Sequence, residues 1–310
     1  MHIVNPQLKS LMAECREALG FNYTVMMHRH YVDYLSATEK RDVSTAAEAA
    51  AKMAEVIQKQ QYYSLHSRVC EYIIDEILTF KFVPELTDLF RQLALTYDIQ
   101  TEFIQANEVY EKCFGLLEPY RDSDNKKMKW FFATLWYNRA QHVRIGEGEK
   151  ELTDYTNEAL AYYQAVNDHH GISLCYNRLA TLLPEDMIEE KLVLLKKIVH
   201  LRKNDDAPSA IALAEINIGF YEIQKGNIDF GVNLMREATK VIEKYTNKRY
   251  AALSNLHFAK GLLAAKRFVD AKDICDYAGK MLKTYNIKAH LPEYEALMAE
   301  IEHAIYQSEA

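Results

Sequence analysis

The sequence has few residues that interrupt helices, since only 6 of its 310 residues are proline and 10 are glycine. The prolines fall between apolar-periodic stretches, at Pro6, Pro84, Pro119, Pro184, Pro208 and Pro292. Because proline breaks a helix interior but is tolerated at a helix start, these positions mark helix boundaries. Runs of β-branched residues in strict alternation are also missing, which argues against a sheet. The sequence therefore predicts an all-α protein.

Cysteine is also sparse, and its distribution excludes a disulfide framework. The five cysteines are widely spaced among apolar neighbours, at Cys15, Cys70, Cys113, Cys175 and Cys275. An odd number in this pattern favours reduced core thiols. The first thirty residues lack the apolar region of a signal peptide, and no stretch approaches the roughly twenty apolar residues of a membrane span. We therefore expect a cytoplasmic protein.

Positive charge is limited as well. The net charge is −7, and the longest basic run is the short segment 125–129. A helix expected over residues 22–37 could be the second helix of a helix-turn-helix, but it would read DNA with Thr24, Met27, His28 and His30. That set is too apolar and too weakly basic for the task. We expect no direct binding of nucleic acid and no membrane association.

Patterns that carry catalysis or bind metals are missing too. His28 and His30 are two apart on a helix and point in different directions, so they cannot share a metal. His169 and His170 precede a turn glycine without a cysteine or carboxylate at ligand spacing. No phosphate-binding glycine loop or nucleophile elbow occurs. We expect no enzyme activity, no cofactor and no metal.

An internal repeat dominates what the sequence does contain. The segment 135–140 (LWYNRA) returns 39 residues later as 174–179 (LCYNRL), each time within an apolar helical pattern. Repetition at this period is typical of stacked helical hairpins, in which each unit packs on its neighbours.

Small and aromatic residues recur at the spacing of two closely packed antiparallel helices. The clearest copy has Ile218-Gly219, a turn glycine at Gly226, and small residues at Gly231 and Ala238. Residues 84 to about 284 therefore resemble the tetratricopeptide repeat superfamily, although the period is longer than the usual ~34 residues. The stretch 155–180 looks most similar to the repeats of the cytosolic peptide-pheromone receptors of the Rap and PlcR kind.

The resemblance implies a right-handed superhelical solenoid of antiparallel helix hairpins. We expect a divergent N-terminal helical segment at 1–83, a repeat array at 84–290 and a C-terminal capping helix at 291–310. Thr45 is the expected N-cap of the third helix, with Glu48 reaching back to it. The fifteen expected helices cover about residues 5–19, 22–37, 45–60, 62–80, 84–97, 101–117, 126–145, 150–166, 169–183, 186–202, 208–225, 228–244, 249–264, 268–284 and 292–307.

A repeated polar strip lies opposite the apolar stripe of the first helix in each hairpin. Thr134 and Asn138 share a helix face, as do Ser173 and Asn177, because residues four apart are neighbours on a helix. Asn217 continues the row 40 residues after Asn177. In tetratricopeptide proteins such helices line the concave groove, and asparagines hold an extended peptide there. An amide supplies both a donor and an acceptor for a peptide backbone.

Charged and aromatic residues accompany the asparagines. Arg139 and Arg178 could bind a ligand carboxylate through two parallel hydrogen bonds, while Tyr137 and Tyr176 could form flanking walls. Asn255, 38 residues after Asn217, is less clearly in register. Alternatively, the repeated Asn-Arg pairs form a ladder between helices and have a structural role.

We interpret the chain as a non-enzymatic peptide- or protein-binding module with a regulatory or signalling role. The alternative is a cytosolic adaptor or scaffold, or a peptide-responsive regulator, that docks through its N-terminal or convex surface. The expected partner is a peptide or a protein, and the formation of a homodimer stays open.

Overall fold

A computed structural model describes residues 6–100, 102–142, 148–203, 205–285, 287 and 290–309 of the chain. Within these ranges the backbone forms fifteen α-helices and two short 3-10 helices, with no strand. The chain divides into two compact units, Met1–Gly171 and Ile172–Ala310. The all-α prediction is confirmed, and so is the expected series of fifteen helices. Residue 5, residue 101 and residues 143–145, which three expected helices include, lie outside the described ranges.

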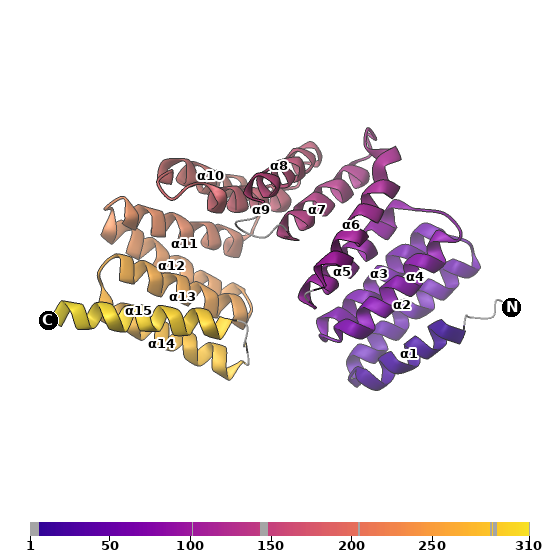
Figure 1. The fold of residues 1–310 in the computed structure, drawn as a ribbon, viewed down its shortest axis with the longest axis horizontal. Coiled ribbons are helices and arrows are strands. Elements are labelled where there is room, and N and C mark those ends of the chain that lie inside the picture. Colours follow the sequence, from indigo (N-terminus) through magenta and orange to yellow (C-terminus); the bar gives the residue numbers. More distant parts are fainter. Residues whose placement is uncertain are drawn as a thin grey trace. The chain divides into compact units, whose positions relative to one another are not determined.

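The first unit is a stack of antiparallel helices (Figure 1). Its α-helices are α1 (Pro6–Ala18), α2 (Phe21–Glu39), α3 (Val43–Lys59), α4 (Tyr63–Leu78), α5 (Thr87–Ile99), α6 (Phe103–Leu117), α7 (Lys126–His142) and α8 (Glu149–Val166). Two 3-10 helices, η1 (Pro84–Leu86) and η2 (Glu118–Tyr120), begin at or next to a proline. Pro84 therefore starts a 3-10 turn that leads into α5, and the α-helix itself begins three residues later than expected.

One continuous hydrophobic core joins the helices of this unit. It runs from Leu8 on α1 to Leu135 on α7. The expected boundary between residues 83 and 84 lies inside this core, so the three-segment division stays a prediction based on the repeat pattern. Helix α1 packs against α4, which is not its neighbour in sequence.

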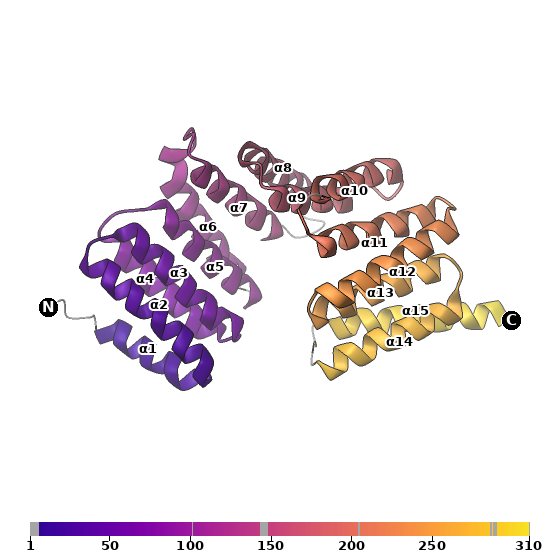
Figure 2. The ribbon, with the colours of Figure 1, turned by 180° about the vertical axis from the view of Figure 1, so that it is seen from behind.

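The second unit continues the hairpin pattern (Figure 2). It contains most of α9 (His169–Leu182), followed by α10 (Ile188–Arg202), α11 (Pro208–Gln224), α12 (Ile228–Tyr245), α13 (Lys248–Ala264), α14 (Phe268–Thr284) and α15 (Leu291–Glu309). The hairpin α11–α12 packs on the hairpin α13–α14 through contacts of both α11 and α12 with α13. Helix α15 covers α14 and buries Leu297 and Ile301, while Glu295 and Glu302 face solvent.

The glycines of the repeat pattern allow α11 and α12 to approach closely. A Cβ atom on Gly219 would lie 2.7 Å from the carbonyl oxygen of Gly231. Gly226 has a φ angle of +94° at the turn between the helices, a conformation that glycine adopts without strain. These positions carry the packing that the tetratricopeptide pattern predicts.

The N-cap predicted for the third helix is wrong. Helix α3 begins at Val43, and its N-cap is Asp42, whose side chain accepts a hydrogen bond from the Thr45 backbone N–H. Thr45 lies in the first turn, and its hydroxyl donates to the other Asp42 oxygen at 2.7 Å. These bonds lower the pKa of Asp42, because they favour its charged form. An aspartate caps a helix as well as a threonine does.

Replacement of the cap gives a measurable effect. Asp42→Ala leaves the backbone N–H of Thr45 without its acceptor, and we expect the midpoint of thermal unfolding to fall by roughly 2–4 °C. Thr45→Ala should have the smaller effect, because it removes only a hydroxyl that donates to Asp42. Thermal melts of the two variants, followed by circular dichroism, compare the two losses and show which residue caps α3. A larger loss for Thr45→Ala would identify threonine as the cap.

Candidate binding surface

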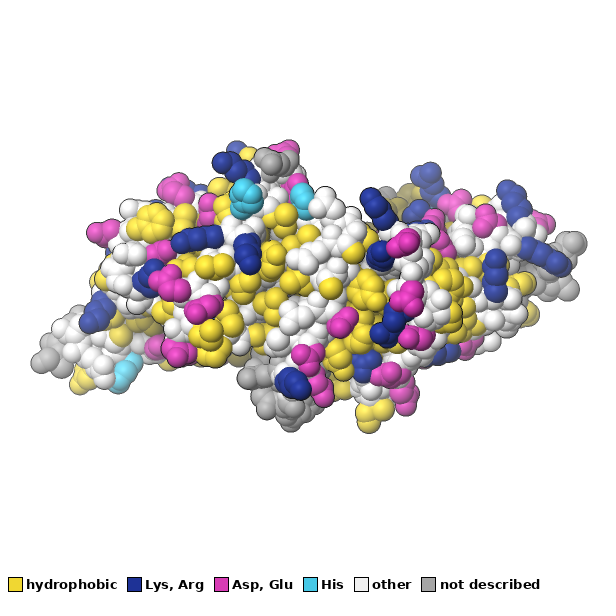
Figure 3. Space-filling view, turned by 90° about the horizontal axis from the view of Figure 1, so that it is seen from above, with side chains coloured by type: hydrophobic (Ala, Val, Ile, Leu, Met, Phe, Trp, Pro, Cys, Tyr) yellow, Lys and Arg dark blue, Asp and Glu magenta, His cyan; other side chains and the backbone are white. Residues whose placement is uncertain are grey.

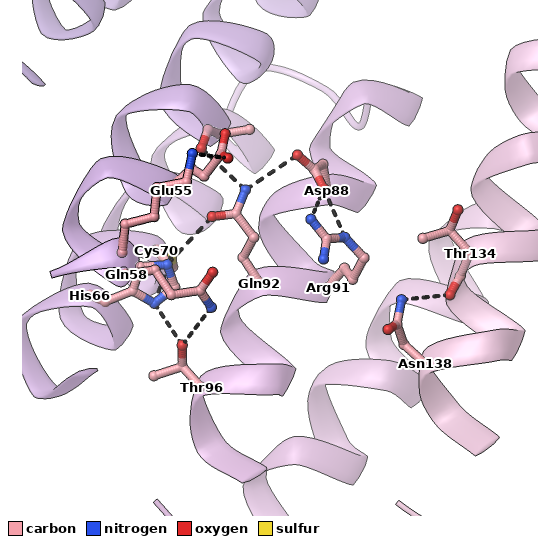
Figure 4. A network of polar contacts seen from close by, with 12 residues as sticks. Glu55, Gln58, His66, Cys70, Asp88, Arg91, Gln92, Thr96, Thr134 and Asn138 are labelled. Carbon is pink, nitrogen blue, oxygen red and sulfur yellow. Dashed lines mark hydrogen bonds and ion pairs between the residues drawn. The ribbon is translucent and has the colours of Figure 1, made fainter. Parts of the chain in front are cut away.

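In the first unit, the predicted polar strip is bonded within the protein. Asn138 is 8% exposed, and its amide donates to the backbone oxygen of Thr134 at 2.7 Å (Figure 4). The Thr134 hydroxyl in turn accepts a hydrogen bond from Tyr163 at 3.3 Å. One of the two amide N–H donors of Asn138 is therefore used by its own helix.

Arg139 also has internal partners. Its guanidinium carbon lies 5.4 Å from the centre of the Phe114 ring and 5.0 Å from that of Tyr155. The same guanidinium forms an ion pair with Glu111. These contacts join α6, α7 and α8, so the structure gives Arg139 a role in packing. Its neighbour Tyr137 is half-buried.

In the second unit, two predicted residues meet on adjacent first helices. The side-chain amide of Asn217 on α11 donates to the Oδ1 atom of Asn177 on α9 at 3.0 Å. Asn177 is exposed and Asn217 is half-buried. The bond uses one acceptor and one donor, so the NH₂ group of Asn177 and the Oδ1 atom of Asn217 have no further partner among the described residues. We call this pair the amide rung.

The other predicted residues of α9 are less accessible than Asn177. Ser173, one turn earlier, is 7% exposed. Tyr176 is half-buried, with the Lys197 ammonium 5.5 Å from its ring centre. Arg178 is half-buried, and its backbone oxygen accepts a hydrogen bond from Thr181 at 2.7 Å. Asn177 and Asn217 are thus two members of the predicted set that a hydrogen bond between their side chains brings together.

The surface beside the amide rung extends onto α13 through an aromatic contact. Phe220 lies one turn after Asn217 on α11. Its ring centre is 5.4 Å from that of His257 and 5.7 Å from the Lys260 ammonium. Residues three or four apart on a helix share a face, so Asn217 and Phe220 are neighbours, as are His257 and Lys260.

His257 occupies the register position that we considered for Asn255. It lies 40 residues after Asn217, the same interval that separates Asn217 from Asn177. Asn255 is 2% exposed and donates to the Ala251 backbone oxygen and to Glu243 on α12. It therefore faces its own hairpin. A strict 40-residue period predicts position 257 as the next member of the row. The row of asparagines does not extend to this position, because the residue there is histidine and not asparagine.

Lys260 places a positive charge on this surface. Burial and the nearby Lys260 ammonium lower the pKa of His257 to about 4, so its ring is neutral at pH 7. Lys260 is exposed. The surface thus combines an amide rung, an aromatic contact and one accessible cation.

A second set of polar side chains is fully enclosed between α3, α4 and α5 (Figure 4). His66 is buried, and its Nδ1 atom lies 2.9 Å from the hydroxyl of Thr96. Its Nε2 atom lies 3.5 Å from the Gln92 side-chain oxygen. Gln92 uses its NH₂ group on the Ala51 backbone oxygen and on Asp88, so its oxygen accepts from His66. Both ring nitrogens of the neutral imidazole are therefore satisfied.

The thiols are enclosed as well. All five cysteines are buried and free. Burial raises the pKa of the Cys15 thiol to about 12, and the pKa of Cys70 is also raised. A thiol that stays protonated is a poor nucleophile.

Neither a cluster of metal ligands nor a membrane-spanning helix occurs in the described part of the chain. No group of three or more His, Cys, Asp or Glu side chains lies close enough to hold a metal ion among these residues. None of the described helices combines the length and the apolar character that crossing a membrane requires.

Charges of both signs are mixed on one face of the molecule. Figure 3 shows Lys and Arg side chains interspersed with Asp and Glu, with hydrophobic side chains between them. The described side chains of this face therefore form no basic patch of the kind that tracks a phosphate backbone. The expected absence of nucleic-acid binding stays a prediction.

Comparison with known proteins was informative only at the level of structure. No family model matches the chain, and no curated protein matches its sequence. The solved structure of BtubC from P. vanneervenii is similar at a TM-score of 0.57 and 18% identity, over 76% of this chain and 91% of that chain. The chain has a tetratricopeptide-like repeat fold.

Two further structures agree with this tetratricopeptide-like fold. A Rap protein complexed with Competence and Sporulation Factor has a TM-score of 0.55 at 14% identity, covering 93% of this chain and 88% of that chain. A signal transduction ATPase with a tetratricopeptide repeat sensor from Pyrococcus horikoshii has a TM-score of 0.54 at 17% identity. It covers 91% of this chain, which spans only 44% of the ATPase. At these identities the likeness concerns the fold alone.

Proposed function

We propose that this protein is a non-enzymatic, regulatory binding module that holds an extended peptide segment on the first helices of its second unit. The observation that carries the proposal is the amide rung, in which Asn177 and Asn217 bond to one another while both stay accessible. The similar fold of a Rap protein complexed with Competence and Sporulation Factor supports the choice of a ligand-binding role.

The chemistry of the rung matches a peptide backbone. Each residue of an extended peptide offers one N–H donor and one C=O acceptor. The remaining NH₂ group of Asn177 would donate to a peptide C=O, and the Oδ1 atom of Asn217 would accept from a peptide N–H. Because these bonds involve only backbone groups of the ligand, the rung supplies affinity with little sequence preference.

Specificity would come from the residues beside the rung. The Phe220 and His257 rings form a surface on which an apolar ligand side chain can pack. Lys260 would pair with a carboxylate, either an acidic side chain or the C-terminus of the peptide. Lys260 would take the role first predicted for Arg139, since Arg139 already pairs with Glu111.

A purely structural ladder between the helices would contain the same hydrogen bond. Peptide binding and thermal stability must therefore be measured together. We expect Asn177→Ala combined with Asn217→Ala to weaken binding roughly tenfold or more, because two ligand hydrogen bonds are lost. The probe is the tightest binder selected by the native protein from an array of short peptides with free C-termini. Its affinity is then measured by fluorescence anisotropy, alongside a thermal melt of each variant.

The matched control is Asn233→Ala, which removes an exposed asparagine from the second helix α12. Binding should stay unchanged in this control. If the double variant binds the probe normally but melts at a clearly lower temperature, the rung is structural. The adaptor function, with docking elsewhere on the surface, would then replace the present proposal.

A further inference from the structure

A groove runs along α4 in the first unit. Its floor is formed by α4 and by residues of α5, and its walls are α1 and α6. It arises because α1 packs against α4, far from it in sequence, and leaves the solvent side of α4 open toward α6. The volume of about 1020 Å³ is at the upper end of the range for pockets that hold small molecules. Its size therefore suits a segment of a protein chain.

The lining of the groove is acidic. It contains five carboxylates and two cations. Arg68 binds both oxygens of Glu14, at 2.7 and 3.0 Å, and Lys112 lies 3.4 Å from Asp75. These pairs use both cations of the lining.

Three carboxylates are left without a cation within the lining. Glu71 accepts a hydrogen bond from the Tyr97 hydroxyl, and Glu76 accepts one from Tyr34 at 2.5 Å. A hydroxyl donor stabilises a carboxylate without neutralising its charge. Glu108 has no ion-pair partner among the described residues and faces solvent. The groove therefore presents three uncompensated negative charges.

The groove also borders an exposed aromatic side chain. Phe80, just after α4, is 53% exposed and lines the groove. It lines a second, small hollow beside Tyr34 and Ile77 as well. An exposed aromatic ring offers an apolar contact that a ligand with charges alone would not use.

We propose that this groove is a docking site for a basic amphipathic segment of a partner protein. Lysine or arginine side chains of the segment pair with Glu71, Glu76 and Glu108, and an apolar side chain covers Phe80. The negative lining selects against nucleic acid and against acidic segments, since like charges in close contact are unfavourable. The inference is independent of the amide rung, because every residue involved belongs to the first unit.

The experiment uses a defined probe with the full-length protein. A fluorescein-labelled helical peptide carries lysines at i, i+3 and i+4 spacing on one face and a central leucine, and an acidic twin carries glutamates instead. We expect the basic peptide to bind in anisotropy measurements at low salt, to weaken as salt rises, and to protect amides of 64–80 and 103–112 from hydrogen exchange. The acidic twin should not bind.

Two charge-matched variants separate the groove from the general charge of the protein. Asp75→Lys with Glu108→Lys reverses two exposed charges at the groove and should weaken binding roughly tenfold, through lost attraction and new repulsion. Asp154→Lys with Glu158→Lys makes the same change in net charge on the exposed side of α8 and should leave affinity within about twofold.

Equal losses in the two variants would overturn the proposal, because the attraction would then come from net charge alone. Absence of peptide binding, or protection that falls outside α4 and α6, would overturn it as well. The Asn177→Ala and Asn217→Ala variant should bind this probe normally. A failure of the groove is thereby distinguished from a failure of the amide rung.

Discussion

Gly231→Ala is expected to lower the free energy of unfolding of the second unit by about 3 kcal/mol, the upper end of the usual cost of overpacking. An added Cβ atom would overlap the carbonyl oxygen of Gly219 on the facing helix and lie 2.6 Å from the Cγ1 atom of Ile223. The first of these obstacles is backbone, which cannot move aside by changing a rotamer. The α11–α12 pair would have to separate, and the packing of α11 on α13 would change with it.

The control is Gly115→Ala, on the exposed side of α6, where a new Cβ atom meets nothing within 4 Å. There the substitution should stabilise by up to ~1 kcal/mol, because alanine is the better helix former. Urea unfolding followed by circular dichroism measures both variants. A Gly231→Ala protein as stable as the native one would mean that α11 and α12 do not approach in the way described.

Acid is expected to destabilise the first unit through His66. Burial lowers the pKa of this histidine to about 4, against about 6.5 in an unfolded chain. Between pH 4 and pH 6.5 this histidine is mostly protonated in the unfolded chain but mostly neutral in the folded protein. The free energy of unfolding therefore falls as the pH decreases from 6.5 to 4. The expected loss is about 3 kcal/mol at pH 4. Above pH 7 this effect disappears.

The physical reason is the closed network around the ring. Nδ1 accepts from Thr96 and Nε2 donates to Gln92, so a second proton would point at the Thr96 hydroxyl, which would have to turn its own hydrogen away. His66→Gln removes the titration. Urea unfolding at pH 7, 5.5 and 4 should show a smaller acid-induced loss for this variant than for the native protein. Equal losses would exclude His66 as the source.

The helical repeat could be predicted from the sequence because its determinants are local. Hairpins are specified by proline at helix starts, by the turn glycine Gly226, and by small residues at Gly219 and Gly231. These features act locally and do not depend on residues distant in sequence. The amide rung follows from the same logic. A 40-residue repeat places Asn177 and Asn217 on equivalent helices, and they bond at 3.0 Å.

Features that depend on neighbours distant in sequence could not be predicted. Arg139 looks like a carboxylate ligand in sequence, but Glu111, Phe114 and Tyr155 surround its guanidinium. The groove along α4 depends on α1 packing against a helix some fifty residues later, for which no local pattern exists. Asp42 and Thr45 are both good capping residues, and only the backbone geometry decides between them.

A peptide held at the amide rung would be detected by native mass spectrometry. Protein purified gently from its own source is compared with the same sample after denaturation, and with the Asn177→Ala and Asn217→Ala variant prepared identically. We expect an added mass of peptide size on the native protein that denaturation releases and that the variant lacks. The bare chain mass in every sample, or an added mass that the variant keeps, would contradict it.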